Sequence, residues 1–152
     1  GASLAATIAS VLILARVAGT LTIPPLSDRW SMRRGMIVFC GLLSLVGAAG
    51  LLASGSSRLL TIAVVIAAGV GLGGVSPLIR AIPIEMDGIG PKLTGAATGL
   101  IFTIGEIGGF SGPFLLGALQ DLTGAYESGI ALLAAGAVVM ILAGASLTGV
   151  DD

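Results

Sequence analysis

Five long stretches of apolar residues, joined by short polar segments, dominate this sequence. We expect each stretch to form a helix, with the helices at about residues 2–26, 35–54, 59–81, 93–118 and 128–148. At about 1.5 Å per residue, each is long enough to cross a hydrocarbon core of about 30 Å. Membrane β-strands alternate apolar and polar residues, whereas these runs are apolar on every face. The sequence therefore predicts an all-α membrane protein, with one transmembrane domain over residues 1–152.

The composition excludes several classes of function. Charged residues make up 10% of the chain, against roughly a quarter in soluble proteins, so its expected surrounding is the lipid bilayer. A net charge of -1 provides no basic field for nucleic acid. The chain has no histidine and only one cysteine, Cys40, and no nucleophile–base pair, metal cluster or phosphate loop is visible. We expect neither enzyme activity nor a metal or cofactor.

The positive charges predict an orientation, because cytoplasmic loops of membrane proteins are rich in Lys and Arg. The second predicted connection holds one such residue, Arg58, whereas the first and third, together with the adjoining helix ends, hold five: Arg29, Arg33, Arg34, Arg80 and Lys92. We expect a multi-pass protein of the plasma membrane, with its N-terminus outside and its C-terminus in the cytoplasm. Because the chain starts at Gly1 without Met, we expect the later part of a longer protein; a natural half-size protein is the alternative.

Glycine is unusually abundant, with 25 residues. In lipid, small residues four positions apart let helix backbones approach closely. One such pair is Gly69 and Gly73. The densest set lies in the fourth predicted helix, where we expect a packing surface made of Gly105, Gly108, Gly109, Gly112 and Pro113. Static packing and an interface that moves during transport both explain this pattern.

A faint internal repeat relates the first predicted helix to the fourth. Four residues recur as identical or similarly small residues 93 positions later: Ala18, Gly19, Leu26 and Asp28 return as Ser111, Gly112, Leu119 and Asp121. The two copies are separated by an odd number of helices, so they would cross the membrane in opposite senses, as in inverted-repeat transporters. Four matches in so restricted an alphabet can also arise by chance.

Two charged residues lie deep inside predicted helices. Arg16 and Glu106 lie about 18 Å and 21 Å from the same membrane side. A charge at the centre of a spanning helix costs about 2.5–3.5 kcal/mol, so each should face a water-filled cavity or a partner. In one interpretation they pair with each other or with residues outside this chain. In the other they form a site, where Arg16 binds an anionic substrate group and Glu106 binds a proton or a substrate cation.

The segment 24–34 resembles the loop signature of the major facilitator superfamily, G-x-x-x-D-R-x-G-R-[KR]. Asp28, Arg29 and Arg33 match this signature directly. It departs from the pattern at three places, where Pro24 and Ser31 replace glycines and Met32 replaces arginine. Residues 95–124, which are rich in glycine, resemble the eleventh helix and following outer loop of bacterial and archaeal members. The resemblance covers essentially the whole chain and implies the eighth to twelfth helices of such a transporter.

The resemblance also implies roles. Asp28, Arg29 and Arg33 would make the gating contacts that steady the outward-facing state; plain positive-inside anchoring is the alternative for this loop. The eighth and eleventh helices flank the central cavity in that family, which would turn Arg16 and Glu106 inward. Members that carry nitrate, cyanate or carboxylates commonly use a mid-membrane arginine, so a small anion is the expected substrate.

These observations predict part of a secondary active transporter that moves a small solute by alternating access. Its expected partners are the lipid bilayer, the small-molecule substrate and the missing N-terminal half of the same protein. The alternative is a non-transporting multispanning scaffold whose glycine-rich faces dock partner helices.

Overall fold

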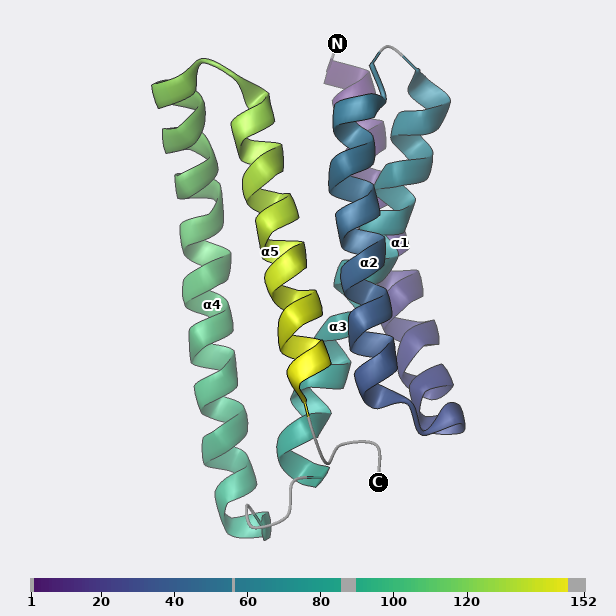
Figure 1. Cartoon of the computed structure of the whole chain (residues 1–152), viewed down its shortest axis with the longest axis vertical. Helices are drawn as coiled ribbons and strands as arrows, with labels where there is room; N and C mark the ends of the chain where they lie inside the picture. Colours follow the sequence, from purple (N-terminus) through teal and green to yellow (C-terminus); the bar gives the residue numbers. More distant parts are fainter. Residues whose placement is uncertain (1, 56, 86–89, 148–152) are drawn as a thin grey trace.

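The computed structural model describes residues 2–55, 57–85 and 90–147, which form a bundle of α-helices (Figure 1). The described helices are α1 Ala2–Trp30, α2 Arg33–Ala53, α3 Arg58–Glu85, α4 Gly90–Thr123 and α5 Tyr126–Ser146. All five are long and apolar enough to cross a membrane. The all-α fold predicted from the apolar runs is confirmed.

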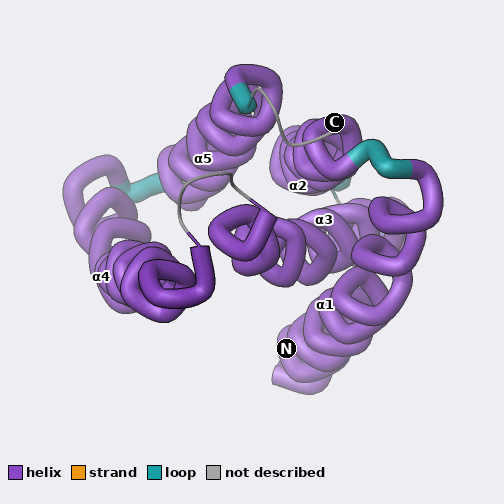
Figure 2. The backbone as a smooth tube through the Cα atoms, turned by 90° about the horizontal axis from the view of Figure 1, so that it is seen from below, coloured by secondary structure: helices purple, strands orange, loops and turns teal. Residues whose placement is uncertain are grey.

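Successive helices run in opposite directions (Figure 1). The end of α1, the start of α2, the end of α3 and the start of α4 therefore share one end of the bundle. Seen along the bundle, α3 lies between α1 and α4, and α2 and α5 form a second row on one side of these three helices (Figure 2). This arrangement places the α1–α2 connection on the same side as the end of α3 and the start of α4, as the predicted orientation requires.

The best-packed part of the bundle consists of α1, α2 and α3. Its buried cluster comprises Ile23, Met36, Ile37, Cys40, Val75 and Leu78. Helix α3 contacts α1 and α2 extensively, and α5 packs on α2. Cys40 is fully buried at the centre of this cluster, so its thiol serves as a small packing group.

Glycines bring α3 against α1. A Cβ atom added at Gly69 would lie 2.6 Å from the Cβ of Ala15, and one added at Gly73 would collide with the backbone carbonyl of Arg16. On the other helix, a Cβ added at Gly19 would collide with the carbonyl of Val70. Real Cβ atoms do not approach other atoms so closely, so this crossing requires glycine on both helices. The packing role predicted for Gly69 and Gly73 is confirmed.

Helix α4 stands apart from this packing. It makes sparse contacts with α5 and α3 and none with α1. In the described chain, no residue is buried within the most apolar segment of this helix. Four of the residues predicted to pack have no described atom within 4 Å of an added Cβ, namely Gly105, Gly108, Gly109 and Gly112, and Pro113 is exposed as well. The packing role of these five residues stays a prediction.

Helices α1 and α4 continue past their prolines and end later than the sequence predicts. Helix α1 continues through Pro24 and Pro25 to Trp30, and α4 continues beyond Pro113 to Thr123. Spanning helices tolerate proline where neighbouring groups satisfy the freed carbonyls. Helix α1 then stops at Ser31, whose φ of 49° is left-handed. The N–H of Met32 donates to the Ser27 carbonyl at 3.3 Å, which completes a Schellman-type cap.

Candidate functional site

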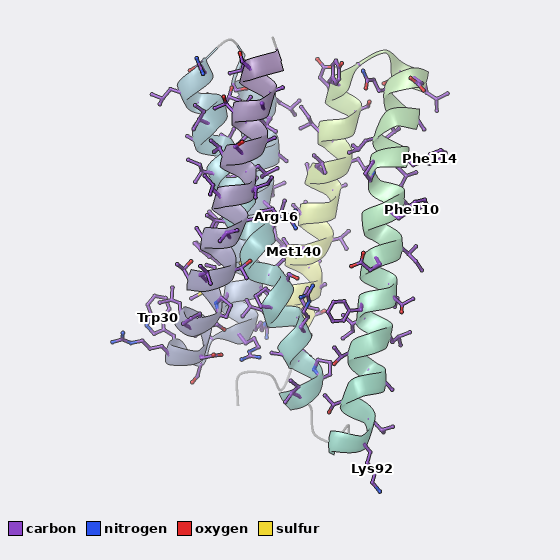
Figure 3. All side chains as sticks on the ribbon, turned by 180° about the vertical axis from the view of Figure 1, so that it is seen from behind. Arg16, Trp30, Lys92, Phe110, Phe114 and Met140 are labelled. Carbon is purple, nitrogen blue, oxygen red and sulfur yellow. The ribbon has the colours of Figure 1, made fainter. Side chains whose placement is uncertain are left out.

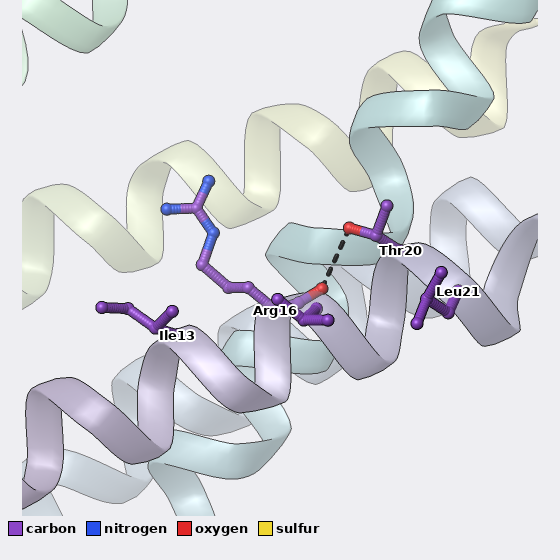
Figure 4. Close-up of a pocket in the computed structure, with 5 residues that line it drawn as sticks. Ile13, Arg16, Thr20 and Leu21 are labelled. Atoms are coloured by element: carbon purple, nitrogen blue, oxygen red, sulfur yellow. Dashed lines mark hydrogen bonds between the residues drawn. The ribbon is translucent and has the colours of Figure 1, made fainter.

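Arg16 lies at the middle of α1, on a turn that α3 holds in place. Its carbonyl oxygen abuts Gly73 of α3, while its side chain is exposed. The side chain borders a shallow hollow of about 320 Å³ whose other lining residues are Ile13, Val17, Thr20 and Leu21 (Figure 4). The backbone at this position is therefore fixed, and the guanidinium projects away from the contact with α3.

Thr20 joins the two helices beside Arg16. Its hydroxyl lies 2.9 Å from the carbonyl oxygen of Arg16, as Figure 4 shows, and 3.0 Å from the carbonyl oxygen of Gly73 on α3. The sequence predicts the bond of Thr20 within its own helix, and Thr22 makes the same kind of bond, its hydroxyl donating to the Ala18 carbonyl at 2.7 Å. It does not predict the contact with α3. Pro77 is the feature of the sequence that could have predicted the second partner of Thr20. A proline leaves the carbonyl four residues earlier, here that of Gly73, without its helical N–H donor.

Glu106 lies at the middle of α4 and is exposed. It borders an open hollow of about 550 Å³, whose other lining residues are Phe102, Thr103, Ile107, Phe110 and Ser111. Phe110 and Phe114 project from α4 on the side away from α5 (Figure 3). The surface around this carboxylate is thus largely aromatic and apolar, with hydroxyl groups from two residues.

Arg80 of α3 contacts Phe102, one of the residues that line this hollow. The carbon of its guanidinium lies 4.3 Å from the centroid of the Phe102 ring, which is the geometry of a cation–π contact. Phe102 precedes Glu106 by one helical turn, so both residues lie on one side of α4. Sequence reasoning counted Arg80 only as a loop charge. It did not predict this link between α3 and α4.

The structure does not bring Arg16 and Glu106 together. They lie on α1 and α4, which do not touch, and α3 lies between these helices (Figure 2). Within the described part of the chain, neither side chain has an ion-pair partner. No group of three or more His, Cys, Asp or Glu side chains in that part could hold a metal ion. The roles predicted for Arg16 and Glu106 stay predictions.

The predicted gating residues lie where α1 gives way to α2. Nη2 of Arg33 lies 2.7 Å from Oδ1 of Asp28, and the Arg33 side chain is only 13% exposed. This ion pair connects the last turn of α1 to the first turn of α2. Arg29 is exposed on the last turn of α1. Two of the three predicted residues therefore form one local contact, and their gating role is a prediction.

The fold and these side chains define a multi-pass α-helical membrane protein with ionisable groups at the centre of two of its spans. The model of the Major Facilitator Superfamily matches residues 1–113, and the chain belongs to this family. The family predicted from segments 24–34 and 95–124 is confirmed.

One relative supports the same assignment. An uncharacterized transporter, YycB, of Bacillus subtilis (strain 168) is 32% identical over 136 residues. The aligned region covers 89% of this chain and 33% of that protein, so the chain spans about a third of its relative's length. No solved structure matches the chain.

Proposed function

We propose that this chain supplies the eighth to twelfth helices of a secondary active transporter that moves a small anion by alternating access. The observation that carries the proposal is Arg16, a charged side chain at the middle of a spanning helix and exposed in the described chain. Such a charge is retained in a membrane only where a cavity or a partner compensates its cost. A substrate anion in a water-filled cavity provides that compensation.

The chemistry of the site follows from the side chains. The planar guanidinium of Arg16 offers paired N–H donors that match a carboxylate or another oxyanion. Glu106, on the opposite flank of α3, takes up the coupling proton or a substrate cation. The Arg16 turn is locked to α3 through Gly73 and Thr20, so a force on the guanidinium would move α1 and α3 together. This coupling suits a mechanism in which helical bundles rock as units.

The protein lies in the plasma membrane, with the α1–α2 connection in the cytoplasm and the start of α1 outside. The Asp28–Arg33 ion pair steadies that connection in the outward-facing state. The other half of the cavity comes from the N-terminal half of the same protein.

Transport by the full-length protein tests the role of Arg16. The protein would be reconstituted in vesicles, and uptake of nitrate and acetate would be measured under an imposed proton gradient. Replacing Arg16 by Gln removes a charged hydrogen-bond donor worth about 1.5–3 kcal/mol, so we expect the apparent affinity to fall about 10- to 100-fold. Arg16→Lys should retain part of it. Arg58→Gln, at the end of the bundle where α3 begins, is the control.

Two results separate this proposal from its alternatives. Unchanged uptake by a well-folded Arg16→Gln variant would rule out Arg16 as the anion site. A variant that no longer folds would instead favour the scaffold, in which Arg16 pairs with a neighbouring helix. The open glycine surface of α4 is the observation that supports this second function.

A further inference from the structure

An apolar hollow of about 270 Å³ lies between α2, α3 and α5. Helix α2 packs on both of the others, whereas α3 and α5 make no close backbone contact with each other in the described chain. Small residues from the three helices meet at one level of the hollow. Ser44, Ala68 and Gly136 each lie about 14 to 15 Å along their helices from the end of the bundle where α3 and α5 begin. Their short side chains leave the space between the helices unfilled.

Helix α4 is the remaining neighbour of α3 and α5, but it contributes no residue to the lining of the hollow. Two contacts hold it in place. At one end of the bundle, the hydroxyls of Thr123 and Ser128 lie 2.9 Å apart and join α4 to α5. Toward the other end, the Arg80–Phe102 contact joins α4 to α3. An added Cβ at Gly136 would meet no described atom within 4 Å, so the hollow is open at that position.

The lining of the hollow is unsuited to water. Apart from Ser44, its side chains are aliphatic or, at Met140, a thioether. The Ser44 hydroxyl donates to the Cys40 carbonyl of its own helix at 2.9 Å. A buried water needs two to four polar partners, whereas an apolar cavity of about 150 Å³ in a soluble protein stays dry and binds benzene. This larger hollow therefore suits a hydrocarbon ligand.

The position of the hollow matches the hydrocarbon part of one lipid leaflet. Its lining includes Leu51, two residues before the end of α2, and Met140, fourteen residues after the start of α5. It thus extends from about 3 Å to about 21 Å below that end of the bundle. One leaflet supplies about 15 Å of the hydrocarbon core. Tyr126, exposed at the start of α5, is the kind of aromatic residue that lies at the level of the headgroups.

We infer that a phospholipid acyl chain occupies this hollow and runs along α2 between α3 and α5. Lipid tails are as apolar as leucine side chains, so a chain that moves from the bilayer into the hollow loses no favourable solvation. It gains dispersion contacts with three helices, which an empty hollow would forfeit. The chain would also connect α3 to α5, which do not pack on each other directly. The inference is independent of the transported substrate.

Photolabelling of the full-length protein in phosphatidylcholine vesicles tests the occupant. One acyl chain of the lipid would carry a diazirine near its middle, and mass spectrometry would locate the adducts after irradiation. Ser44 and Ala48 are buried in the described chain, whereas Val46 of the same helix is 57% exposed and reports on chains at the protein surface. We expect adducts at Ser44 or Ala48 as well as at Val46. Adducts at Val46 alone would overturn the inference.

A matched pair of substitutions shows whether these adducts come from the hollow. Gly136→Leu projects a side chain into it, whereas Ala131→Leu enlarges an exposed position of α5 outside the lining. Gly136→Leu should abolish labelling of Ser44 and Ala48 and preserve that of Val46. Ala131→Leu should preserve all of it. Unchanged labelling of Ser44 and Ala48 in Gly136→Leu would contradict an acyl chain in the hollow.

Thermal unfolding of the same variants distinguishes an acyl chain from a packed helix. A flexible chain is displaced by the new side chain, so Gly136→Leu should melt no lower than Ala131→Leu. A helix in the hollow would instead be overpacked, and Gly136→Leu would then melt about 2 °C or more below Ala131→Leu. That result would assign the hollow to a helix of the full-length protein and overturn the inference.

Discussion

Pro77 leaves a gap in the hydrogen bonding of α3, at the level of Arg16. Its ring nitrogen has no hydrogen to donate to the carbonyl of Gly73. The Thr20 hydroxyl of α1 lies 3.0 Å from that carbonyl oxygen and takes the place of the missing donor. Within a spanning helix a carbonyl freed by proline is satisfied by a neighbouring group, and here that group comes from α1. Pro77 on α3 is thereby linked to the candidate site around Arg16 on α1.

Thr20→Val should consequently destabilise the protein. The substitution keeps the size of the side chain but leaves the Gly73 carbonyl without a donor, at a cost of about 0.6–2 kcal/mol. Thr22→Val is the control, since within the described residues the Thr22 hydroxyl bonds only to the Ala18 carbonyl of its own helix. Unfolding of the full-length protein in detergent, followed by circular dichroism, measures both. Thr20→Ser should behave like the parent protein, and an equal loss in Thr20→Val and Thr22→Val would exclude the interhelical bond.

Single residues also show where sequence reasoning stops. The buried position of Cys40 and the close packing of Gly69 and Gly73 were predictable, because each follows from residue size in an apolar helix. The second partner of Thr20 was not, since it depends on which helix lies opposite. Ser31 is an intermediate case: the family signature has glycine there, and a φ of 49° explains why. A left-handed residue other than glycine costs about 1–2 kcal/mol, which this chain tolerates.

At the scale of elements, the contact between α3 and α4 is sparse, and the Arg80–Phe102 pair is its clearest interaction. Phe102→Leu keeps an apolar side chain but removes the ring face that attracts the guanidinium. We expect a loss of about 0.5–1 kcal/mol, and no further loss when Arg80→Gln is added. A double-mutant cycle on unfolding of the full-length protein measures this coupling. Phe110→Leu, which removes an exposed ring from the same helix, should cost less; additive effects of Phe102→Leu and Arg80→Gln would contradict the contact.

The existence of the helices was predictable, whereas their ends and partners were not. Twenty or more apolar residues in succession leave a chain in lipid few options besides a helix. Helices α1 and α4 end four and five residues beyond the predicted positions, because the end of an apolar run does not fix where helical hydrogen bonding stops. The depths of Arg16 and Glu106 followed from counting residues. Their separation by α3 required the packing order of the helices, which periodicity does not specify.

At the scale of the whole molecule, the bundle gathers its positive charges at one end. Arg29, Arg33 and Arg34 lie around the α1–α2 connection, and Arg80 and Lys92 lie toward the same end on α3 and α4 (Figure 1). Arg58 begins α3 at the other end. Loops counted separately in the sequence thus form one positively charged rim, which strengthens the case for a cytoplasmic location of that rim.

Thiol labelling of the full-length protein in intact cells would measure this orientation. In a Cys40→Ala background, single cysteines would replace Met32 at the positively charged end and Ser57 at the opposite end, both of which are exposed. Because retention of Lys and Arg in the cytoplasm sets the orientation, a membrane-impermeant maleimide should label Ser57→Cys from outside. It should label Met32→Cys only after the membrane is permeabilised. Labelling of Met32→Cys in intact cells, with Ser57→Cys protected, would show that the orientation is the reverse of the one proposed. The Asp28–Arg33 pair would then lie at the outer surface.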